Sequence, residues 1–403
     1  MLRPRLSRAA LLTCLFAALV PGTSPALAKT KSRRVIEAMD ATYTHYKPGL
    51  VGLCLGAVDG KVRRIKCYGR VAPGSTNKPD ADTLFGIASI TKTFTATQLA
   101  VQVAQGKVKL GGLVRNFIPP ADDPGNFPPN VTLKDLAQHY SGLPRDPPVA
   151  VTDFHQLFQL AGDCYATPGC RAKEPETAGF YSNWAFDILG IVLGRHAGFA
   201  PQPLPSGNVM PPWEPDLQQQ VLFPLGLQHT ASFVGFDRAG ALPYYTAHVA
   251  TGVTRTGAPF FTSQFPGTPV TDAGGGLMSS SRDMLKWLRY SMFGATNGAL
   301  KDGFPLLYRR PLLYRNSGLG KIGLAWNITS DKGYKVVNKD GKLAGYESFI
   351  SFLQNKSRGV FVLLNDDPAA FAAPDVSCRL LRALPPRKKK IPCPAADDKA
   401  TTP

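Results

Sequence analysis

The sequence is poor in metal-binding patterns. Neither Cys-x-x-Cys nor His-Glu-x-x-His, two spacings typical of a metal site, occurs in its 403 residues. The six histidines are scattered singly along the chain. The glycine run Gly274–Gly276 is not followed by a lysine at the spacing of a phosphate-binding loop. We therefore expect neither a metal nor a cofactor.

Acidic residues are also few. The chain has 28 Asp and Glu residues against 46 Lys and Arg residues, which gives a formal net charge of +18. A protein this basic is attracted to anionic surfaces such as cell-wall polymers and membrane headgroups. The positive charge is the only feature that favours nucleic-acid binding, because the sequence contains no recognised nucleic-acid-binding motif. We expect peripheral association with anionic surfaces of the cell envelope and no nucleic-acid partner.

Long hydrophobic runs are missing except near the N-terminus. There the apolar stretch Ala9–Val20 follows three arginines and precedes the sequence Ala26-Leu27-Ala28. A basic start, a short apolar run and an A-x-A site are typical of a secretory signal peptide, here residues 1–28 with cleavage before Lys29. An uncleaved anchor is the alternative, but the run is short for a bilayer span. The pattern predicts an exported protein, located in the periplasm or secreted.

Cysteines are few, and export would leave an even number of them. Cys14 lies in the signal segment. The other six are Cys54, Cys67, Cys164, Cys170, Cys378 and Cys393. Six cysteines can pair in many ways, so the sequence does not fix the disulfides. Pairing of nearest neighbours is favoured, and buried free thiols are the alternative.

The most informative stretch starts with the apolar run Leu84–Ala88 and continues from Ser89 to Val103 without proline or glycine. This pattern predicts a strand-like entry into a helix, with Ser89 near the helix start. Lys92 follows three residues later, so both side chains would lie on one helix face. A serine hydroxyl becomes a good nucleophile when a neighbouring group attracts its proton, and the helix N-terminus adds positive potential. The stretch therefore predicts an activated serine.

Ser-x-x-Lys is nevertheless a weak pattern on its own. A second copy, Ser75–Lys78, lies between Pro73-Gly74 and Pro79, where turn residues exclude a helix. For Ser89 the alternative is an ordinary helix N-cap with a solvated lysine. The other motifs of the chain have to decide between these interpretations.

Strand patterns occur at both ends of the chain. A hairpin is predicted at residues 50–58 and 62–68, and later strands at 322–328, 334–338, 348–353 and 360–364. Helical periodicity and many prolines mark the middle of the chain, and a helix is expected at its start from residue 35. We predict an α/β (α+β) fold in which one antiparallel sheet, flanked by helices, is built from both chain ends beside a mainly helical lobe.

This organisation divides the chain into four parts. Residues 1–28 would be the signal peptide, residues 29–88 and 274–393 the α/β sheet domain, residues 89–273 the mainly helical domain, and residues 394–403 a disordered tail.

Two further motifs offer groups that suit acyl-transfer chemistry. Tyr181-Ser182-Asn183 opens a predicted helix, and its phenol and amide can shuttle a proton and orient a carbonyl group. Lys339-Asp340-Gly341-Lys342 follows a predicted strand and brings a cation and exposed backbone N–H groups. Each pattern is common on its own. Tyr314–Asn316 also fits Tyr-x-Asn, and Lys301–Gly303 also fits Lys-x-Gly.

The order, spacing and context of the three motifs resemble those of the serine β-lactamase and penicillin-binding protein superfamily. Further segments are similar to its class C β-lactamase branch, namely His139–Pro144, Tyr181–Leu189, Gly274–Asp283 and Gly341–Tyr346. The sequences of Tyr181–Asp187 and Gly142–Asp146 most resemble those of D-alanyl-D-alanine carboxypeptidase/endopeptidases of the AmpH type. The resemblance spans roughly residues 35–380 and implies the β-lactamase/transpeptidase fold.

The resemblance also implies a role for each motif residue. Ser89 would be the acylated nucleophile, Lys92 would lower its proton affinity, and Tyr181 would be the partner base and the acid for the leaving group. Asn183 would position Lys92 and the substrate amide. On the third motif, Lys339 would supply positive potential, Gly341 would belong to the substrate-binding strand, and the N–H groups of Ser89 and Lys342 would form the oxyanion hole. Whether Lys92 or Tyr181 takes the proton stays open, and His139 is expected to brace a loop.

Asp340 departs from the family pattern, in which a hydroxyl residue that meets the substrate carboxylate often occupies this position. An acidic side chain facing the pocket would repel such a carboxylate. We predict an exported serine acyl-hydrolase that forms an acyl-enzyme on D-amino-acid peptides of peptidoglycan and is acylated by β-lactams. The alternatives are a β-lactamase or esterase of the same fold, and a catalytically inert cell-wall-binding protein.

Overall fold

The computed structural model describes residues 25–170, 179–204, 206–260, 272–314, 320–331, 333–354, 357–368, 370–384 and 391–393. Most of the predicted signal peptide and the predicted tail at 394–403 lie outside these ranges. Among the described residues, none of the helices has the length and apolar character needed to cross a bilayer.

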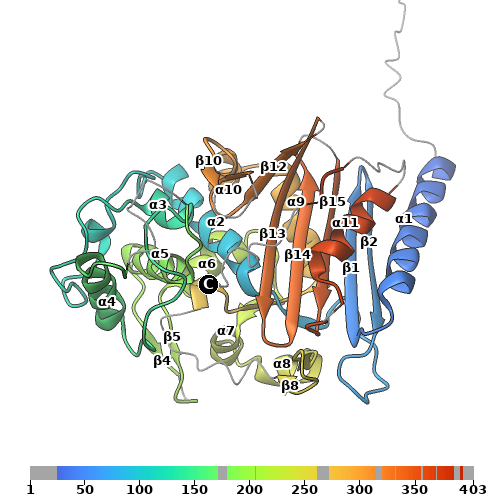
Figure 1. Ribbon diagram of the computed structural model, residues 1–403, viewed down its shortest axis with the longest axis horizontal. Coiled ribbons are helices and arrows are strands. Elements are labelled where there is room, and N and C mark those ends of the chain that lie inside the picture. The colour runs from blue at the N-terminus through green and yellow to red at the C-terminus, as the bar shows by residue number, and fades with distance from the viewer. Residues whose placement is uncertain are drawn as a thin grey trace, which may run out of the picture.

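An antiparallel sheet of eight strands dominates one half of the molecule (Figure 1). In spatial order, its strands are β10 (Leu312–Tyr314), β11 (Gly320–Ile322), β12 (Asn327–Asp331), β13 (Tyr334–Leu343), β14 (Tyr346–Leu353), β15 (Arg358–Leu364), β1 (Gly52–Asp59) and β2 (Val62–Gly69). The N-terminal hairpin β1–β2 thus pairs with the last strand, and Leu55 lies opposite Val362. The predicted sheet, assembled from both chain ends, is confirmed.

Helices cover both faces of this sheet. α1 (Pro25–Tyr46) and α11 (Ala373–Ala383) lie against one face (Figure 1). α9 (Ser281–Phe293) contacts β1, β14 and β15 from the other. Because side chains alternate along a strand, Leu53 and Leu55 of β1 pack in the core under α1 and α11, whereas Cys54 points into the larger core on the opposite side.

The chain between β3 and β9 is mainly helical and fills the other half of the molecule (Figure 1). The α-helices of this region are α2 (Thr91–Ala104), α3 (Leu133–Ala137), α4 (Phe154–Ala166), α5 (Asn183–His196), α6 (Trp213–Leu217), α7 (Phe233–Arg238) and α8 (Leu242–His248). Outside it, α10 (Gly298–Gly303) follows α9. The single-turn helices of the region are η1 (Ala88–Ile90), η2 (Val114–Phe117), η3 (Gln218–Leu222) and η5 (Asp272–Gly274), and η6 (Phe304–Leu307) follows α10. Residues 91–102 of α2 are all buried, which places this helix at the centre of the molecule.

Three small sheets complete the described part of the chain. β3 (Leu84–Gly86) and β6 (Thr230–Ser232) pair with the two sides of β9 (Leu277–Ser280), which brings the stretch before Ser89 next to the stretch after the glycine run. The other two are the hairpins β4–β5 (Gln202–Pro203 and Val209–Met210) and β7–β8 (Gly252–Val253 and Pro259–Phe260).

The prediction of a single strand at 322–328 is wrong. The chain reverses between β11 and β12, where the N–H of Gly323 donates to the carbonyl of Trp326 at 2.8 Å. Ala325 has a φ of +64°, a left-handed conformation that the apolar sequence does not reveal. The turn is apolar because Leu324 and Trp326 are buried in the core. The opening helix, predicted from residue 35, begins at Pro25.

Three disulfides join cysteines that are nearest neighbours in the sequence. They are Cys54–Cys67, Cys164–Cys170 and Cys378–Cys393. Cys54 and Cys67 lie directly opposite each other on β1 and β2. The structure therefore contains the pairing of nearest neighbours that the sequence favoured.

Candidate active site

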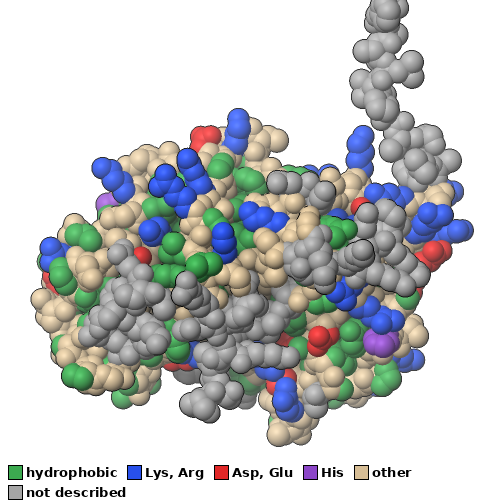
Figure 2. Space-filling view, turned by 45° about the horizontal axis from the view of Figure 1, so that its top comes forward, with side chains coloured by type: hydrophobic (Ala, Val, Ile, Leu, Met, Phe, Trp, Pro, Cys, Tyr) green, Lys and Arg blue, Asp and Glu red, His purple; other side chains and the backbone are tan. Residues whose placement is uncertain are grey.

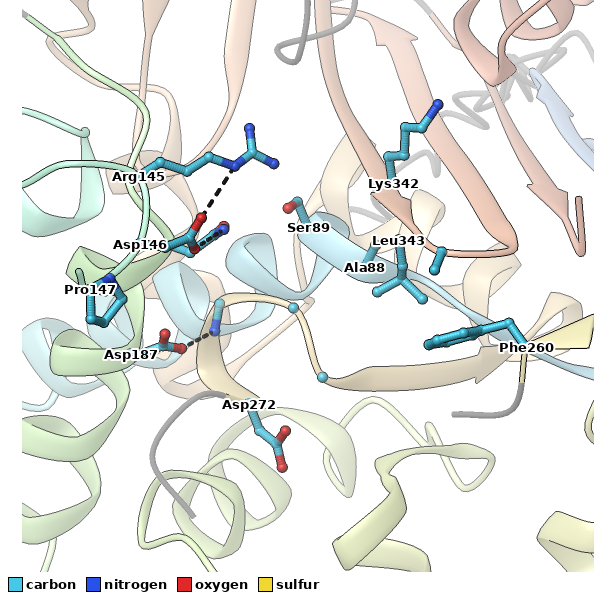
Figure 3. Close-up of a pocket in the computed structure, with 15 residues that line it drawn as sticks. Ala88, Ser89, Arg145, Asp146, Pro147, Asp187, Phe260, Asp272, Lys342 and Leu343 are labelled. Atoms are coloured by element: carbon cyan, nitrogen blue, oxygen red, sulfur yellow. Dashed lines mark hydrogen bonds and ion pairs between the residues drawn. The ribbon is translucent and has the colours of Figure 1, made fainter. Parts of the chain in front are cut away.

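A cavity of about 450 Å³ opens between the helical half and the end of β13. Ser89 lies at its centre, with Arg145 and Asp146 on one side and Lys342 and Leu343 on the other (Figure 3). Residues from three distant parts of the chain therefore share one cavity.

Ser89 is held in the turn η1, immediately before α2. The preceding residue, Ala88, has a φ of +46°, a conformation that a residue with a Cβ atom rarely adopts. The turn is fixed by hydrogen bonds on both sides of Ile87, whose N–H donates to Leu277 O (3.0 Å) and whose carbonyl accepts from the Ser348 hydroxyl (2.8 Å). The surrounding sheets thus hold the strained turn that presents Ser89 to the cavity.

Lys92 lies at the first turn of α2 and is fully buried. Its Nζ donates to Ser89 Oγ (3.1 Å), to Asn183 Oδ1 (2.7 Å) and to the carbonyl of Gly274 (2.5 Å). Burial, together with the neighbouring Lys339 ammonium, lowers the pKa of Lys92 to about 7. An appreciable share of the side chain is therefore neutral near neutral pH and able to accept a proton.

Tyr181 contacts the same serine. Its hydroxyl lies 2.5 Å from Ser89 Oγ. Three cations approach its ring: Lys92 Nζ at 4.9 Å, Lys339 Nζ at 5.2 Å and Arg145 Cζ at 5.2 Å from the centroid. Positive charges at this distance stabilise negative charge on the phenol oxygen. Ser89 thus has two candidate proton acceptors, the Lys92 amine and the Tyr181 oxygen.

Asn183 is the first residue of α5, which Ser182 caps by accepting the N–H of Ala185 at 3.0 Å. The Oδ1 atom of Asn183 accepts from Lys92, and its Nδ2 atom donates to Asp146 Oδ1 at 2.7 Å. These two contacts fix the orientation of the amide and tie Lys92 to the rim of the cavity.

His139 holds the backbone on both sides of Tyr181. The N–H of Phe180 donates to the carbonyl of His139 (2.8 Å), and the N–H of Ser182 donates to its Nδ1 atom (3.1 Å). The His139 ring is fully buried and lies 4.6 Å from the ring of Tyr181. Burial, with Lys92 and Lys339 nearby, lowers the pKa of His139 well below its usual value, so the imidazole stays neutral and its Nδ1 remains an acceptor. His139 thus braces the loop that carries Tyr181.

The third motif lies at the end of β13, beside the serine turn. A Cβ atom on Gly341 would lie 2.3 Å from Ile87 O and 2.4 Å from Ser348 Oγ, so only glycine allows this strand to come so close. Lys339 and Asp340 are both buried and form an ion pair of 3.0 Å. The ammonium of Lys342 pairs with Glu347 (3.0 Å) and Asp367 (2.8 Å).

Comparison with known proteins identifies the family. Residues 33–380 match the family described as Beta-lactamase. The chain belongs to the β-lactamase family.

Two relatives show how this β-lactamase family member compares with others. It is 27% identical over 350 residues to the D-alanyl-D-alanine-carboxypeptidase/endopeptidase AmpH of Escherichia coli strain K12, which covers 81% of this chain and 83% of that protein. It is 22% identical over 346 residues to a Beta-lactamase of Pseudomonas fluorescens, which covers 78% of this chain and 88% of the relative. Family and relatives identify the chain as a serine hydrolase, as the motifs predicted.

The fold agrees with that assignment. The crystal structure of a class C beta lactamase from Rhodobacter sphaeroides superposes with a TM-score of 0.68 and 22% sequence identity, covering 87% of this chain and 98% of the other. The predicted β-lactamase-like fold is therefore confirmed.

The predicted site residues of this serine hydrolase differ in how directly they contact Ser89. Ser89, Lys92, Tyr181 and Asn183 form one hydrogen-bonded cluster. Lys339 lies over the ring of Tyr181. Gly341 touches the serine turn, and Lys342 lines the cavity while its ammonium is engaged by carboxylates.

Asp187 is a supporting residue that motif reasoning missed. Its Oδ1 atom accepts the N–H of Gly274 at 2.8 Å (Figure 3). The carbonyl of the same glycine accepts from Lys92. Burial raises the pKa of Asp187 well above its usual value. The available signal was its spacing, because a residue four positions after Asn183 lies on the same helix face.

Proposed function

We propose that this serine hydrolase is an exported acyl-hydrolase that acts through an acyl-enzyme on D-amino-acid peptides of peptidoglycan, in the manner of a D-alanyl-D-alanine carboxypeptidase/endopeptidase. The observation that carries the proposal is the double contact of Ser89 Oγ, 2.5 Å from the Tyr181 hydroxyl and 3.1 Å from the Lys92 amine. The similarity to AmpH supports peptides as the substrate class.

In the proposed reaction, Ser89 Oγ attacks the substrate carbonyl carbon while its proton passes to Lys92 or Tyr181. The N–H groups of Ser89 and Lys342 stabilise the negative charge that develops on the carbonyl oxygen. The tetrahedral intermediate collapses when Tyr181 protonates the leaving nitrogen. The acyl group remains as an ester on Ser89 until water hydrolyses it.

A β-lactamase is the second candidate, favoured by the relative from Pseudomonas fluorescens. The two functions share acylation and differ in how fast water releases the acyl group. A penicilloyl ester that persists for minutes after mixing supports a peptidase, whereas release within seconds identifies a β-lactamase.

Acylation by a fluorescent penicillin tests the nucleophile. Wild type is expected to be labelled covalently, and Ser89→Ala is expected to lose the label. Ser75→Ala is the matched control, because it removes the serine of the other Ser-x-x-Lys, which lies in a loop and not in a helix. Equal labelling of wild type and Ser89→Ala would contradict the proposal.

Mass spectrometry after incubation with muropeptides tests the substrate. Loss of a terminal D-alanine or cleavage of a cross-link by wild type, and not by Ser89→Ala, supports the peptidase. An inert cell-wall-binding protein would instead bind peptidoglycan and turn over no acyl donor in either form.

Export is part of the proposal. The N-terminal signal pattern supports it, and so do the three disulfides, because such bonds persist mainly in oxidising compartments. N-terminal sequencing of the protein from the periplasm or medium is expected to begin at Lys29. Recovery of the full-length chain from the cytosol alone would contradict it.

A further inference from the structure

Three cations near Ser89 pair with acids of the protein itself. Lys339 pairs with Asp340 at 3.0 Å, the Lys342 ammonium with Glu347 at 3.0 Å, and Arg145 with Asp146 at 3.5 Å. This balance contrasts with the whole chain, whose formal net charge is +18. Acids of the protein therefore offset the charge of these three cations where substrate is proposed to bind.

The pair of Lys339 and Asp340 is the most buried of the three. Their side chains are only 1% and 9% exposed, so water screens them little and each charge largely cancels the field of the other. The pair of Arg145 and Asp146 is more exposed and contributes less.

This ion pair lies beside Tyr181, the residue that protonates the leaving atom in the proposed reaction. Tyr181 has to reach the leaving atom in order to protonate it, and Lys339 Nζ lies 5.2 Å from the centroid of the Tyr181 ring. In the proposed reaction, a substituent on the leaving atom would therefore approach Lys339 and, through it, the carboxylate of Asp340. A carboxylate there would lose its hydration and gain little net attraction, because it meets a negative charge beside the positive one.

We propose that this enzyme selects acyl donors whose leaving group has no carboxylate next to the scissile bond. Suitable leaving groups are an amidated amino acid, a side-chain amine or an alcohol. The inference rests on the proposed acyl-enzyme function and narrows its substrate class: release of free D-alanine, the carboxypeptidase reaction, becomes the slower one, and donors with an uncharged leaving group the faster ones. The chemical steps are unchanged: Ser89 Oγ takes the acyl group, the leaving amine or alcohol departs with a proton, and water then hydrolyses the ester on Ser89.

A pair of acyl donors tests this preference directly. They share one D-alanyl acyl group and differ only in the leaving group, D-alanine or D-alaninamide. Wild type is expected to have a kcat/KM about tenfold or more higher for the amide. Asp340→Asn removes the negative charge with little change in shape, and is expected to shift the carboxylate-to-amide ratio by about tenfold towards the carboxylate.

Asp302→Asn is the matched control, because it makes the same charge change on exposed α10 and should leave the ratio unchanged. Asp340→Thr serves as a second variant if Asp340→Asn does not fold, as judged by thermal unfolding. A wild-type preference for D-alanine, or an unchanged ratio in a folded Asp340 variant, would overturn the inference.

Penicillin provides an independent readout, because it carries a carboxylate of its own. Asp340→Asn is expected to be acylated about tenfold faster than wild type by the fluorescent penicillin. An unchanged rate in the folded variant would count against the inference. Failure of the proposed function looks different, since then neither peptide nor penicillin would acylate Ser89 in any variant.

Discussion

At the scale of single residues, the buried amine of Lys92 links the geometry of the site to pH. Because its pKa is lowered to about 7, the amine is mostly charged below that pH and mostly neutral above it. If the neutral amine accepts the Ser89 proton, kcat/KM should rise about tenfold per pH unit below 7 and level off above it. Lys92→Arg keeps the charge at all pH values and should reduce kcat/KM by about 10²-fold or more.

Steady-state hydrolysis of an ester donor between pH 5 and 9 checks this expectation. A profile without a rising limb near pH 7 would assign the proton to Tyr181 instead.

His139 yields a second prediction at this scale, because its carbonyl and its Nδ1 hold the two residues next to Tyr181. Its φ of +59° restricts the useful substitutions to residues that tolerate a left-handed backbone. His139→Asn keeps an acceptor near the position of Nδ1 and should retain most of the activity. His139→Gly suits the backbone but has no acceptor, and should lower kcat by about tenfold or more with little change in KM.

Measuring kcat, KM and thermal unfolding for both variants separates positioning from folding. Equal kcat values for the two variants would show that the acceptor does not position Tyr181.

At the scale of elements, the site depends on how closely β13 approaches the serine turn. Gly341→Ala would place a methyl group 2.3 Å from the carbonyl oxygen of Ile87, so the strand or the turn must move. We expect acylation of Ser89 to fall by at least about tenfold and the free energy of unfolding to fall by about 1–3 kcal/mol. The control is Gly111→Ala, since the added methyl group would have no atom within 4 Å.

Rates of penicillin labelling and denaturant titrations of the two variants provide the comparison. If Gly341→Ala behaves like Gly111→Ala, the close approach has no functional role.

Some of these elements can be predicted from the sequence and others cannot. The hairpin at 52–69 and the strands at 334–364 were predictable, because short apolar runs are separated by turn residues. The reversal at 323–326 was hidden, since its residues are apolar and its turn depends on a left-handed alanine. Motif spacing drew attention to Ser89 and Tyr181, but the pairing of Lys339 with Asp340 depends on side-chain positions that no pattern encodes.

At the scale of the whole molecule, one hydrophobic core joins the helical half to the sheet half. Phe94 of α2 stacks on Trp287 of α9 with ring centroids 3.7 Å apart, and the same core includes Cys54 and Phe361 of the large sheet. The division of the chain at residues 88 and 274 remains a proposal. The shared core explains how a cavity between the two halves keeps its geometry.

The basic surface provides the last prediction. Lys and Arg side chains are prominent on the face drawn in Figure 2, and exposed examples occur in both halves of the molecule, among them Arg63, Arg115 and Lys321. We expect the protein to cosediment with peptidoglycan that carries anionic polymers, and to be released as salt rises, because the Debye length shrinks from about 30 Å at 0.01 M to about 3 Å at 1 M salt. Ser89→Ala should bind equally well, since the surface and not the cavity makes the contact. Peptidoglycan stripped of its anionic polymers is the control, and binding that persists at 1 M salt or on the stripped material would show that recognition is not electrostatic.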